Sequence, residues 1–343
     1  MPEAAPPIPD ARVTVAIPVR NGGELLAEVL RSLACQTVAH ELLVCDSGSS
    51  DGSPELARAH GARLIEIAPE SFGHGRTRNL LMQEASGSHV AFLTQDAVPA
   101  GERWLECLLG GFSLAEDVAV SFGPYRARPG ASLLVRLELE SWFASLAPDQ
   151  APRLDRLTAA ESALDAVSLM GRRGFLSDAN ACLARAAWER VPFRDVAYAE
   201  DRALALDLLR AGYAKAYVPE AMVVHSHDYT PLQQLRRSFD ESRALLEIYG
   251  WREPVTLRHL LGQLRGAAGQ VNRELARDGV PRAARVGPLA RTGADRAARL
   301  GGSILGSRAE RLPARARRVL SLERRSGVPP RRPEAHPEGT SSR

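Results

Sequence analysis

Residues 42–53 of the chain read LLVCDSGSSDGS, an apolar run followed by a polar one. The apolar residues predict a buried strand, and the polar residues after them predict a turn. We expect Ser53 to cap the following helix, because Pro54 then takes the first helical position. Asp46 ends the strand, and parallel α/β sheets hold their ligands outside the carboxyl ends of the strands.

The alternation of strand and helix continues on both sides of this stretch. Residues 13–19 (VTVAIPV) predict another buried strand, and apolar residues at helical spacing follow it. Further strands are expected at residues 63–67 and 90–93, with a helix from about residue 73 to residue 87 between them. Strands that alternate with helices predict βαβ units. The fold class is therefore α/β, with a mostly parallel nucleotide-binding sheet flanked by helices.

The alternation is weaker beyond residue 123. The patterns there predict helices at 133–147, 201–210 and 232–249, strands at 178–183 and 217–225, and a loop or irregular helix at 153–173. From residue 255 onward we expect a helical extension that is interrupted at Gly279, Pro281, Gly287, Pro288 and Pro313.

Positive charge is concentrated near the end of the chain. Residues 258–325 hold sixteen arginines against five acidic residues. Such a segment is typical of contact with an anionic surface, a membrane or a nucleic acid, or it is a solvated helical face. No apolar run reaches the roughly 20 residues of a membrane span, so a membrane role would be peripheral.

Cysteine usage and the start of the chain bear on the compartment. Cys35, Cys45, Cys107 and Cys182 lack metal-ligand spacing and predict free thiols in a reducing environment. Residues 1–10 have no basic segment of the kind that opens a secretory signal. We therefore expect a cytoplasmic protein.

The first candidate site is a nucleotide pocket around Asp46. Its carboxylate can accept hydrogen bonds from a ring N–H or from a ribose hydroxyl, and Ser47 lies in the same loop. A plain turn role for Asp46 is the alternative. The end of the first strand supplies a neighbouring wall made of Pro18, Val19, Arg20 and Asn21.

The second candidate site would hold phosphate and metal. Arg78 lies near the start of a helix, where a positive side chain is unfavourable unless an anion binds there. Asp96, preceded by Gln95, follows a strand and can hold Mg²⁺ or Mn²⁺ against a diphosphate. His225 and His227 are two residues apart on an expected strand, so they point the same way toward a metal or phosphate. The alternatives are solvent-exposed charge for Arg78, a turn or cap role for Asp96, and ordinary polar loop residues for His225 and His227.

The third candidate site is catalytic. Asp201 lies in the first turn of an expected helix and can serve as a general base toward an acceptor hydroxyl. Glu200 is the alternative carrier of that role, and helix capping is the alternative function of Asp201. The acceptor is expected near Asn180 and Asp201.

Four segments taken together resemble the inverting family 2 glycosyltransferases with a GT-A fold. They are VTVAIPVRNGG, ELLVCDSGSSDGS, FGHGRTRNLLMQEASGSHVAFLTQDA and AEDRALALDLLRAGY, and they span roughly residues 12 to 230. The segments HGRTRN, TQDA and VVHSHDYT look like the bacterial rhamnosyltransferase branch. That resemblance implies transfer of a sugar from a nucleotide-diphosphate donor, with dTDP-L-rhamnose favoured, to a glycan or lipid-linked acceptor.

The resemblance also implies roles for individual residues. Asp46 would contact the base or ribose, Arg78 the donor side, and Asp201 would match the catalytic base of the Glu-Asp motif. Asp96 stands for the last carboxylate of the metal-binding Asp-x-Asp motif, whose first position is Thr94 here. Because one carboxylate makes a weak site, His225 or His227 would complete it, or metal dependence would be loose.

The resemblance covers the first two of four parts into which we divide the chain, and composition distinguishes the other two. The four parts are a nucleotide-sugar-binding half (12–125), an acceptor-binding and catalytic half (126–254), a basic helical extension (255–323) and a disordered tail (324–343). The function alternatives are a nucleotidyltransferase, for which the expected Gly-rich, Lys-bearing phosphate loop is missing, and a non-catalytic nucleic-acid-binding protein that uses the basic region. No nucleic acid partner is expected for the glycosyltransferase.

Overall fold

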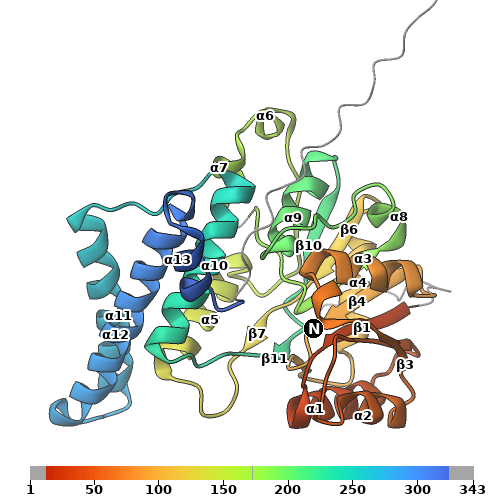
Figure 1. The fold of residues 1–343 in the computed structure, drawn as a ribbon, viewed down its shortest axis with the longest axis horizontal. Coiled ribbons are helices and arrows are strands. Elements are labelled where there is room, and N and C mark those ends of the chain that lie inside the picture. The colour runs from red at the N-terminus through yellow and green to blue at the C-terminus, as the bar shows by residue number, and fades with distance from the viewer. Residues whose placement is uncertain (1–12, 172, 324–343) are drawn as a thin grey trace, which may run out of the picture.

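The computed structural model describes residues 13–171 and 173–323 (Figure 1). Within these residues, the main sheet has the strand order β3-β2-β1-β4-β9-β6-β10-β8. Its strands are β1 (Val13–Val19), β2 (Glu41–Asp46), β3 (Arg63–Glu66), β4 (His89–Leu93), β6 (Val118–Phe122), β8 (Arg153–Asp155), β9 (Asn180–Ala184) and β10 (Ala214–Tyr217). A small second sheet has the order β5-β11-β7 and consists of β5 (Val98–Pro99), β7 (Tyr125–Arg126) and β11 (Val223–Val224).

Helices cover both faces of the main sheet, as the sequence predicted (Figure 1). Side chains alternate along β1, so Val15 and Ile17 face one core while Ala16 faces the other. The first core is closed by α1 (Gly23–Ala34), α2 (Ser53–Ala59) and α4 (Trp104–Gly110). The second is closed by α3 (His74–Glu84), α5 (Leu133–Leu146), α8 (Arg185–Trp188) and α9 (Glu200–Arg210).

Strand direction decides which residues meet at the functional edge of the sheet. β3, β2, β1 and β4 are parallel, and the register pairs Val19 with Asp46. β9 runs antiparallel between β4 and β6, with Asn180 opposite Leu93. The residues just before β9 therefore lie at the edge where β1, β2 and β4 end. The mostly parallel sheet is confirmed, with β8 and β9 as antiparallel strands.

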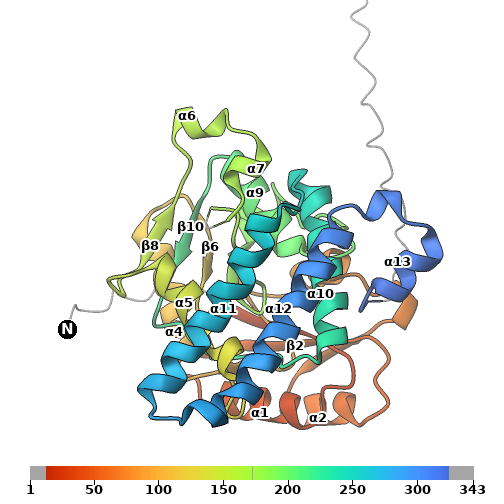
Figure 2. The same ribbon diagram turned by 90° about the vertical axis from the view of Figure 1, so that its left-hand side faces the viewer.

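The C-terminal part is helical, as expected. It contains α10 (Pro231–Tyr249), α11 (Leu257–Arg277), α12 (Val286–Gly306) and α13 (Ala314–Leu320). α11 and α12 lie side by side, away from β1, β2 and β3 (Figures 1 and 2). A Cβ on Gly302 or Gly306 would come within 2.2 Å of a backbone oxygen of α10, so glycine permits the close approach of α10 and α12. Among the described helices, none is long and apolar enough to span a bilayer.

Several sequence expectations were wrong in detail. Ser53 is the first residue of α2 rather than its cap, because Gly52 takes the left-handed conformation before it, with φ of 83°. Residues 217–225 form two strands in different sheets, since β10 ends at Tyr217 and β11 begins at Val223. Pro219, which lacks an N–H, lies in the connection. Gly287 and Pro288 fall inside the first turn of α12, where the missing N–H of proline is harmless.

Other elements went unpredicted. β6 has the apolar pattern of a buried strand, and β8 with two short helices, α6 (Ala159–Ser162) and α7 (Ala166–Leu169), occupies the segment expected to be irregular. The predicted disordered tail and the start of the chain lie outside the described residues.

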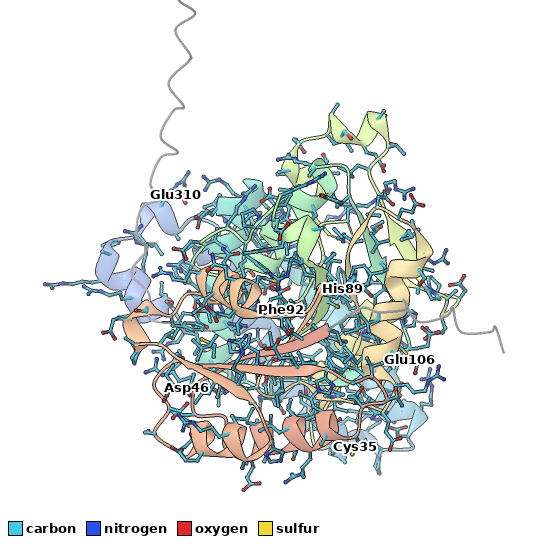
Figure 3. All side chains as sticks on the ribbon, turned by 90° about the vertical axis from the view of Figure 1, so that its right-hand side faces the viewer. Cys35, Asp46, His89, Phe92, Glu106 and Glu310 are labelled. Carbon is cyan, nitrogen blue, oxygen red and sulfur yellow. The ribbon has the colours of Figure 1, made fainter. Side chains whose placement is uncertain are left out.

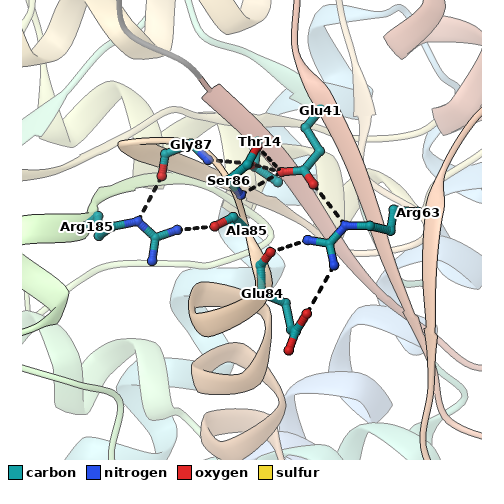
Figure 4. Close-up of polar contacts among 8 residues, drawn as sticks. All are labelled: Thr14, Glu41, Arg63, Glu84, Ala85, Ser86, Gly87 and Arg185. Atoms are coloured by element: carbon teal, nitrogen blue, oxygen red, sulfur yellow. Dashed lines mark hydrogen bonds and ion pairs between the residues drawn. The ribbon is translucent and has the colours of Figure 1, made fainter.

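A polar network fastens the edge of the sheet that is opposite the functional one (Figure 4). The Glu41 carboxylate accepts hydrogen bonds from Thr14 Oγ1 at 2.6 Å and from Ser86 N at 2.8 Å, and it pairs with Arg63 Nε at 3.0 Å. Partial burial opposes ionisation, but these hydrogen bonds lower the pKa of Glu41 to about 2. The network ties β1, β2 and β3 to the segment between α3 and β4.

Candidate functional site

Asp46 lies in an ordered loop at the carboxyl edge of the sheet. Figure 3 shows it on the same side of the molecule as Glu310, away from His89 at the amino end of β4. The side chain is buried, and Oδ2 accepts hydrogen bonds from Gly48 N and Ser49 N, both at 2.9 Å. Oδ1 is buried and accepts no hydrogen bond from the described residues. Such an oxygen can accept a hydrogen bond from a ligand.

The neighbouring wall is held by hydrogen bonds to loops that are distant in sequence. Arg20 N donates to Gln95 Oε1 at 2.8 Å, and Gln95 Nε2 donates back to Arg20 O at 3.2 Å. Asn21 N donates to Ser49 Oγ at 2.8 Å, and Asn21 has φ of 51°. Ser47 N and Oγ both donate to Val19 O. The predicted nucleotide residues at the ends of β1, β2 and β4 therefore form one surface, which also includes Pro18 and Asp96.

Asp96, His225 and His227 converge although they come from separate segments. Their nearest potential ligand atoms all lie within 4.8 Å of one another. The cause is the small sheet, in which Val98 of β5 is antiparallel to Val224 of β11. Extending that register by two residues brings residue 96 beside residues 225–227. His225 Nδ1 then lies 3.5 Å from Asp96 Oδ1, and His227 Nε2 lies 3.6 Å from Asp96 Oδ2.

The environment of this cluster favours neutral imidazoles. Burial lowers the pKa of His225, against the attraction of Asp96. Burial and the neighbouring His225 lower the pKa of His227 to about 4. His225 Nδ1 is buried and has no hydrogen-bond partner in the described part of the chain. Neutral imidazole nitrogens beside a carboxylate are the protonation states that bind a metal ion. The three residues therefore fit a divalent cation.

Arg78 is the centre of a second, acidic cluster. Its Nη1 lies 2.6 Å from Glu200 Oε1, its Nε lies 2.9 Å from Asp178 Oδ2, and all three side chains are almost fully buried. Burial raises the pKa of Asp178, against the attraction of Arg78. The guanidinium is thus committed to two carboxylates of the protein. Because two nitrogens of the guanidinium lie beside protein carboxylates, the direct phosphate contact of Arg78 stays a prediction.

Asp201 differs from its neighbour Glu200. Glu200 is paired with Arg78, whereas Asp201 lines an open cavity of about 130 Å³ together with Ser177 and Tyr198. Burial and the Glu200 carboxylate raise the pKa of Asp201 to about 6, against the attraction of Arg78 and Arg202. A carboxylate with this pKa, facing a cavity, is suited to proton transfer near neutral pH.

The backbone two residues before Asp201 is strained. Ala199, the residue before α9, has φ of 60° and ψ of 39°. Residues with a side chain rarely adopt this left-handed conformation, and those that do cluster at functional sites. No side chain caps the start of α9, but Asp201 Oδ1 accepts a hydrogen bond from Arg202 N at 2.7 Å within the first turn, where an acidic residue also suits the helix dipole.

Tyr125 connects the two clusters. Its ring packs edge-on against His225, with ring centroids 5.2 Å apart. Its hydroxyl donates to Ser177 Oγ, and Ser177 lines the cavity at Asp201. A short chain of contacts through His225, Tyr125 and Ser177 therefore links Asp96 to the cavity at Asp201, although the two aspartates are far apart in the sequence.

Asn180 is fully buried, and its amide bonds to Trp104 Nε1, Pro124 O and Ala221 O. It therefore holds the scaffold, and an acceptor position near Asn180 and Asp201 stays a prediction. Asp178 and Tyr125 were not predicted as site residues. Asp178 is recognised as a site residue only from the antiparallel pairing of β9 in the sheet, and local sequence patterns do not predict that pairing.

Comparison with solved structures identifies the class of the fold. The chain resembles a mannosyltransferase from Pyrobaculum calidifontis, solved in complex with GDP-Man and Mn²⁺, with a TM-score of 0.58. The two are 17% identical, and the match covers 89% of this chain and 90% of that one. The fold is that of the GT-A glycosyltransferases.

Comparison of sequences identifies the family. Residues 14–163 match the family model of glycosyl transferase family 2. The chain is 31% identical over 235 residues to the O-antigen chain rhamnosyltransferase RfbN of Salmonella typhimurium, covering 67% of this chain and 71% of that protein. It is also 31% identical over 204 residues to the O-antigen chain rhamnosyltransferase WbaN of Salmonella anatum, covering 58% of this chain and 61% of that protein. The chain belongs to glycosyltransferase family 2 and is an enzyme, which sets aside the nucleotidyltransferase and non-catalytic alternatives.

Proposed function

We propose that this chain is an inverting glycosyltransferase that moves a sugar from a nucleotide-diphosphate donor to a hydroxyl group of a glycan or lipid-linked acceptor. The observation that carries the proposal is the position of Asp201. It lines a cavity, its pKa is raised to about 6, and the contacts of Tyr125 join that cavity to Asp96, His225 and His227. A base on one side and a cation site on the other suit a displacement at a carbon held between them.

The donor nucleotide is proposed to bind at the ends of β1 and β2. Asp46 Oδ1, which is buried and without a partner among the described residues, would accept a hydrogen bond from the base or the ribose. Pro18, Val19, Arg20 and Asn21 would form one wall, and Ser47 and Gln95 hold that wall in place. This places the sugar end of the donor toward Asp96.

A divalent ion is proposed at Asp96, His225 and His227. One carboxylate oxygen and two neutral imidazole nitrogens suit Mn²⁺ better than Mg²⁺, which prefers oxygen ligands. When bound, the ion would offset negative charge on the diphosphate. Arg128 Nη2 donates to Asp96 O at 2.7 Å and so fixes the backbone that carries the carboxylate.

The chemical step is proposed to be a single displacement. Asp201 takes the proton of the acceptor hydroxyl while that oxygen forms a bond to the anomeric carbon of the donor sugar. The bond from that carbon to the diphosphate oxygen breaks, and the nucleoside diphosphate leaves with the electron pair. Attack opposite to the leaving group inverts the anomeric configuration. Holding both substrates in line supplies much of the rate.

Rhamnose is the proposed sugar, with dTDP-L-rhamnose as the favoured donor. Two rhamnosyltransferases of O-antigen synthesis, each 31% identical to this chain over their aligned residues, support this choice. The segments HGRTRN, TQDA and VVHSHDYT resemble the same branch.

Peripheral contact with the inner face of the cytoplasmic membrane is proposed for the basic extension. Val255, Leu257 and Leu261 are exposed near the start of α11, and Arg258 and Arg265 lie beside them. Exposed apolar side chains flanked by arginine suit an anionic lipid surface. Flotation with anionic vesicles tests this, and Leu257→Asp should reduce vesicle binding. Equal binding by the variant would count against the contact.

A panel of nucleotide sugars tests the proposed reaction. The protein with Mn²⁺ is incubated with each donor, and slow hydrolysis and protection against heat unfolding are recorded. We expect the largest response with dTDP-L-rhamnose. With an acceptor in hand, the anomeric configuration of the product by NMR decides between inversion and retention. A response to no nucleotide sugar would overturn the proposal.

A further inference from the structure

The last described residues of the chain return to the candidate active site. Asp240 of α10 is fully buried, and its Oδ2 accepts hydrogen bonds from Leu322 N at 2.7 Å and from Glu323 N at 3.1 Å. A buried carboxylate that accepts from two successive backbone N–H groups fixes the position of that backbone. We call residues 321–323 the C-terminal strap.

The Glu323 carboxylate of the strap lies beside two basic side chains. Glu323 Oε1 lies 3.4 Å from Arg237 Nη1, and Glu323 Oε2 lies 3.7 Å from His74 Nε2. Arg237 comes from α10 and His74 from the start of α3, so Glu323 spans two separate elements. His74 Nε2 is buried and has no hydrogen-bond partner in the described ranges. Arg237 and His74 thus face the same position, and the Glu323 carboxylate occupies it.

This point lies beside the acidic cluster and the cavity at Asp201. Arg237 packs over the ring of Tyr198, with Cζ 4.1 Å from the ring centroid, and Tyr198 lines that cavity. His74 Nδ1 lies 4.0 Å from Glu200 Oε1. On the other side, α10, the helix that carries Arg237, begins at Pro231, soon after His227 of the proposed cation site.

The chemistry of the pair suits a phosphoryl group. Arginine binds carboxylate and phosphate with the same planar fork of donors, so a carboxylate on an arginine can occupy a phosphate site. Arg78, the arginine that the sequence predicted for this task, is buried between Glu200 and Asp178. Arg237 is partly exposed, at 25%, and its partner Glu323 is exposed to a similar extent, at 24%. A partly exposed ion pair contributes little free energy and can be exchanged for a more highly charged ligand.

We propose that Arg237 and His74 form a subsite for phosphoryl oxygens of the leaving nucleoside diphosphate, and that Glu323 occupies this subsite until a donor displaces it. The inference rests on the proposed glycosyl transfer. The Glu323 side chain thus competes with the donor, and its displacement accompanies donor binding, while Asp240 keeps the backbone of the strap in place.

Substitution of Glu323 tests the competition. Titration calorimetry with dTDP and Mn²⁺ would be run on wild-type protein, Glu323→Gln and Arg237→Gln. We expect Glu323→Gln to tighten dTDP binding about two- to fivefold, the range of one partly exposed ion pair. Arg237→Gln should weaken binding at least about tenfold, as expected for a lost bond to a charged group. In the Arg237→Gln background, Glu323→Gln should bring no further gain.

A matched control and a second ligand separate the possible outcomes. Glu310→Gln removes another acidic side chain of the same region, paired with Arg252, and should leave dTDP binding unchanged. Unchanged or weaker dTDP binding by Glu323→Gln, with wild-type protein that binds dTDP, would overturn the subsite while leaving the proposed function intact. A gain seen with farnesyl diphosphate and not with dTDP would overturn the assignment to the donor. If wild-type protein binds no nucleoside diphosphate, the proposed function fails and the subsite fails with it.

Discussion

Glu200 Oε1 lies 2.6 Å from Arg78 Nη1 in an ion pair whose side chains are only about 5% exposed. The pair neutralises one of two adjacent acidic residues and leaves Asp201 to face the cavity. Two carboxylates that are neighbours in sequence therefore have different environments. This difference in environment distinguishes Asp201, the candidate base, from Glu200, which positions the site.

Replacement of Arg78 should affect stability more than ligand contact. Arg78→Met leaves Asp178 and Glu200 buried without their cation, and loss of one partner of a buried pair costs about 3–5 kcal/mol. Urea unfolding measures the change. Arg76→Met, which breaks an exposed pair with Asp195, is the matched control and should cost no more than about 1 kcal/mol. Wild-type stability of Arg78→Met combined with loss of nucleotide binding would favour the phosphate role instead.

Replacement of Asp201 should affect turnover and spare donor binding. Asp201→Asn removes the proposed base, and general-base catalysis contributes about 10²–10⁴-fold to the rate. Single-turnover transfer and dTDP titration together measure both effects. Asp207→Asn, on the same helix and paired with Arg194, should transfer at nearly the wild-type rate. Transfer by Asp201→Asn at the wild-type rate would exclude Asp201 as the base.

The pH profile of transfer should show the ionisation of this carboxylate. Burial and Glu200 raise the pKa of Asp201 to about 6, and the base acts in its ionised form. The rate is therefore full above that pH and falls about tenfold per pH unit below it. The measurement is kcat from pH 4.5 to 8 with saturating substrates. A rate that stays nearly full down to about pH 5, as an aspartate of ordinary pKa near 4 would give, would contradict the raised pKa of Asp201.

Metal affinity should depend on all three residues of the cation site. Asp96→Ala and His225→Ala should each weaken Mn²⁺ binding at least about tenfold, since loss of even an outer-shell partner costs about 10- to 100-fold. Calorimetry or the paramagnetic effect of Mn²⁺ on water relaxation reports the affinity. His60→Ala changes a histidine directly after α2, outside this cluster, and serves as the control. Undiminished Mn²⁺ affinity in both site variants would remove the ion from this position.

The network around Glu41 should make stability depend on pH. Hydrogen bonds hold the pKa of Glu41 at about 2, below the usual value of 4.5 for a glutamate. The carboxylate therefore stabilises the fold above pH 4.5, and this contribution is lost as the pH falls toward 2. Glu41→Gln should lower the free energy of unfolding by about 1–3 kcal/mol at pH 7. The difference between variant and wild type should shrink at acidic pH, and a pH-independent difference would contradict the assignment.

Local patterns in the sequence were sufficient for the elements of the first half. The strand before Asp46, the helix after Gly52 and the acidic loop between them follow from apolar periodicity and turn chemistry, which act over a few residues. The same is true of the strand that ends before Asp96. Because parallel strands end at one edge, the sequence also predicted that Asp46 and Asp96 share a surface.

Local sequence patterns do not predict which distant segments pair. The antiparallel insertion of β9 puts Asp178 at the carboxyl edge, and the register of β5 with β11 sets Asp96 beside His225 and His227. A charge at a helix start predicted an anion for Arg78, but burial against Glu200 decided its partner.

By itself, the sequence determined which side chains end the strands of the first half and which acidic residues open α9, because these depend on local spacing. Only the tertiary structure decided which carboxylate is neutralised, which faces the cavity and which basic groups Glu323 reaches. The reason is physical: burial and charge pairing depend on the whole surroundings of a side chain, and elements far apart in the sequence supply them.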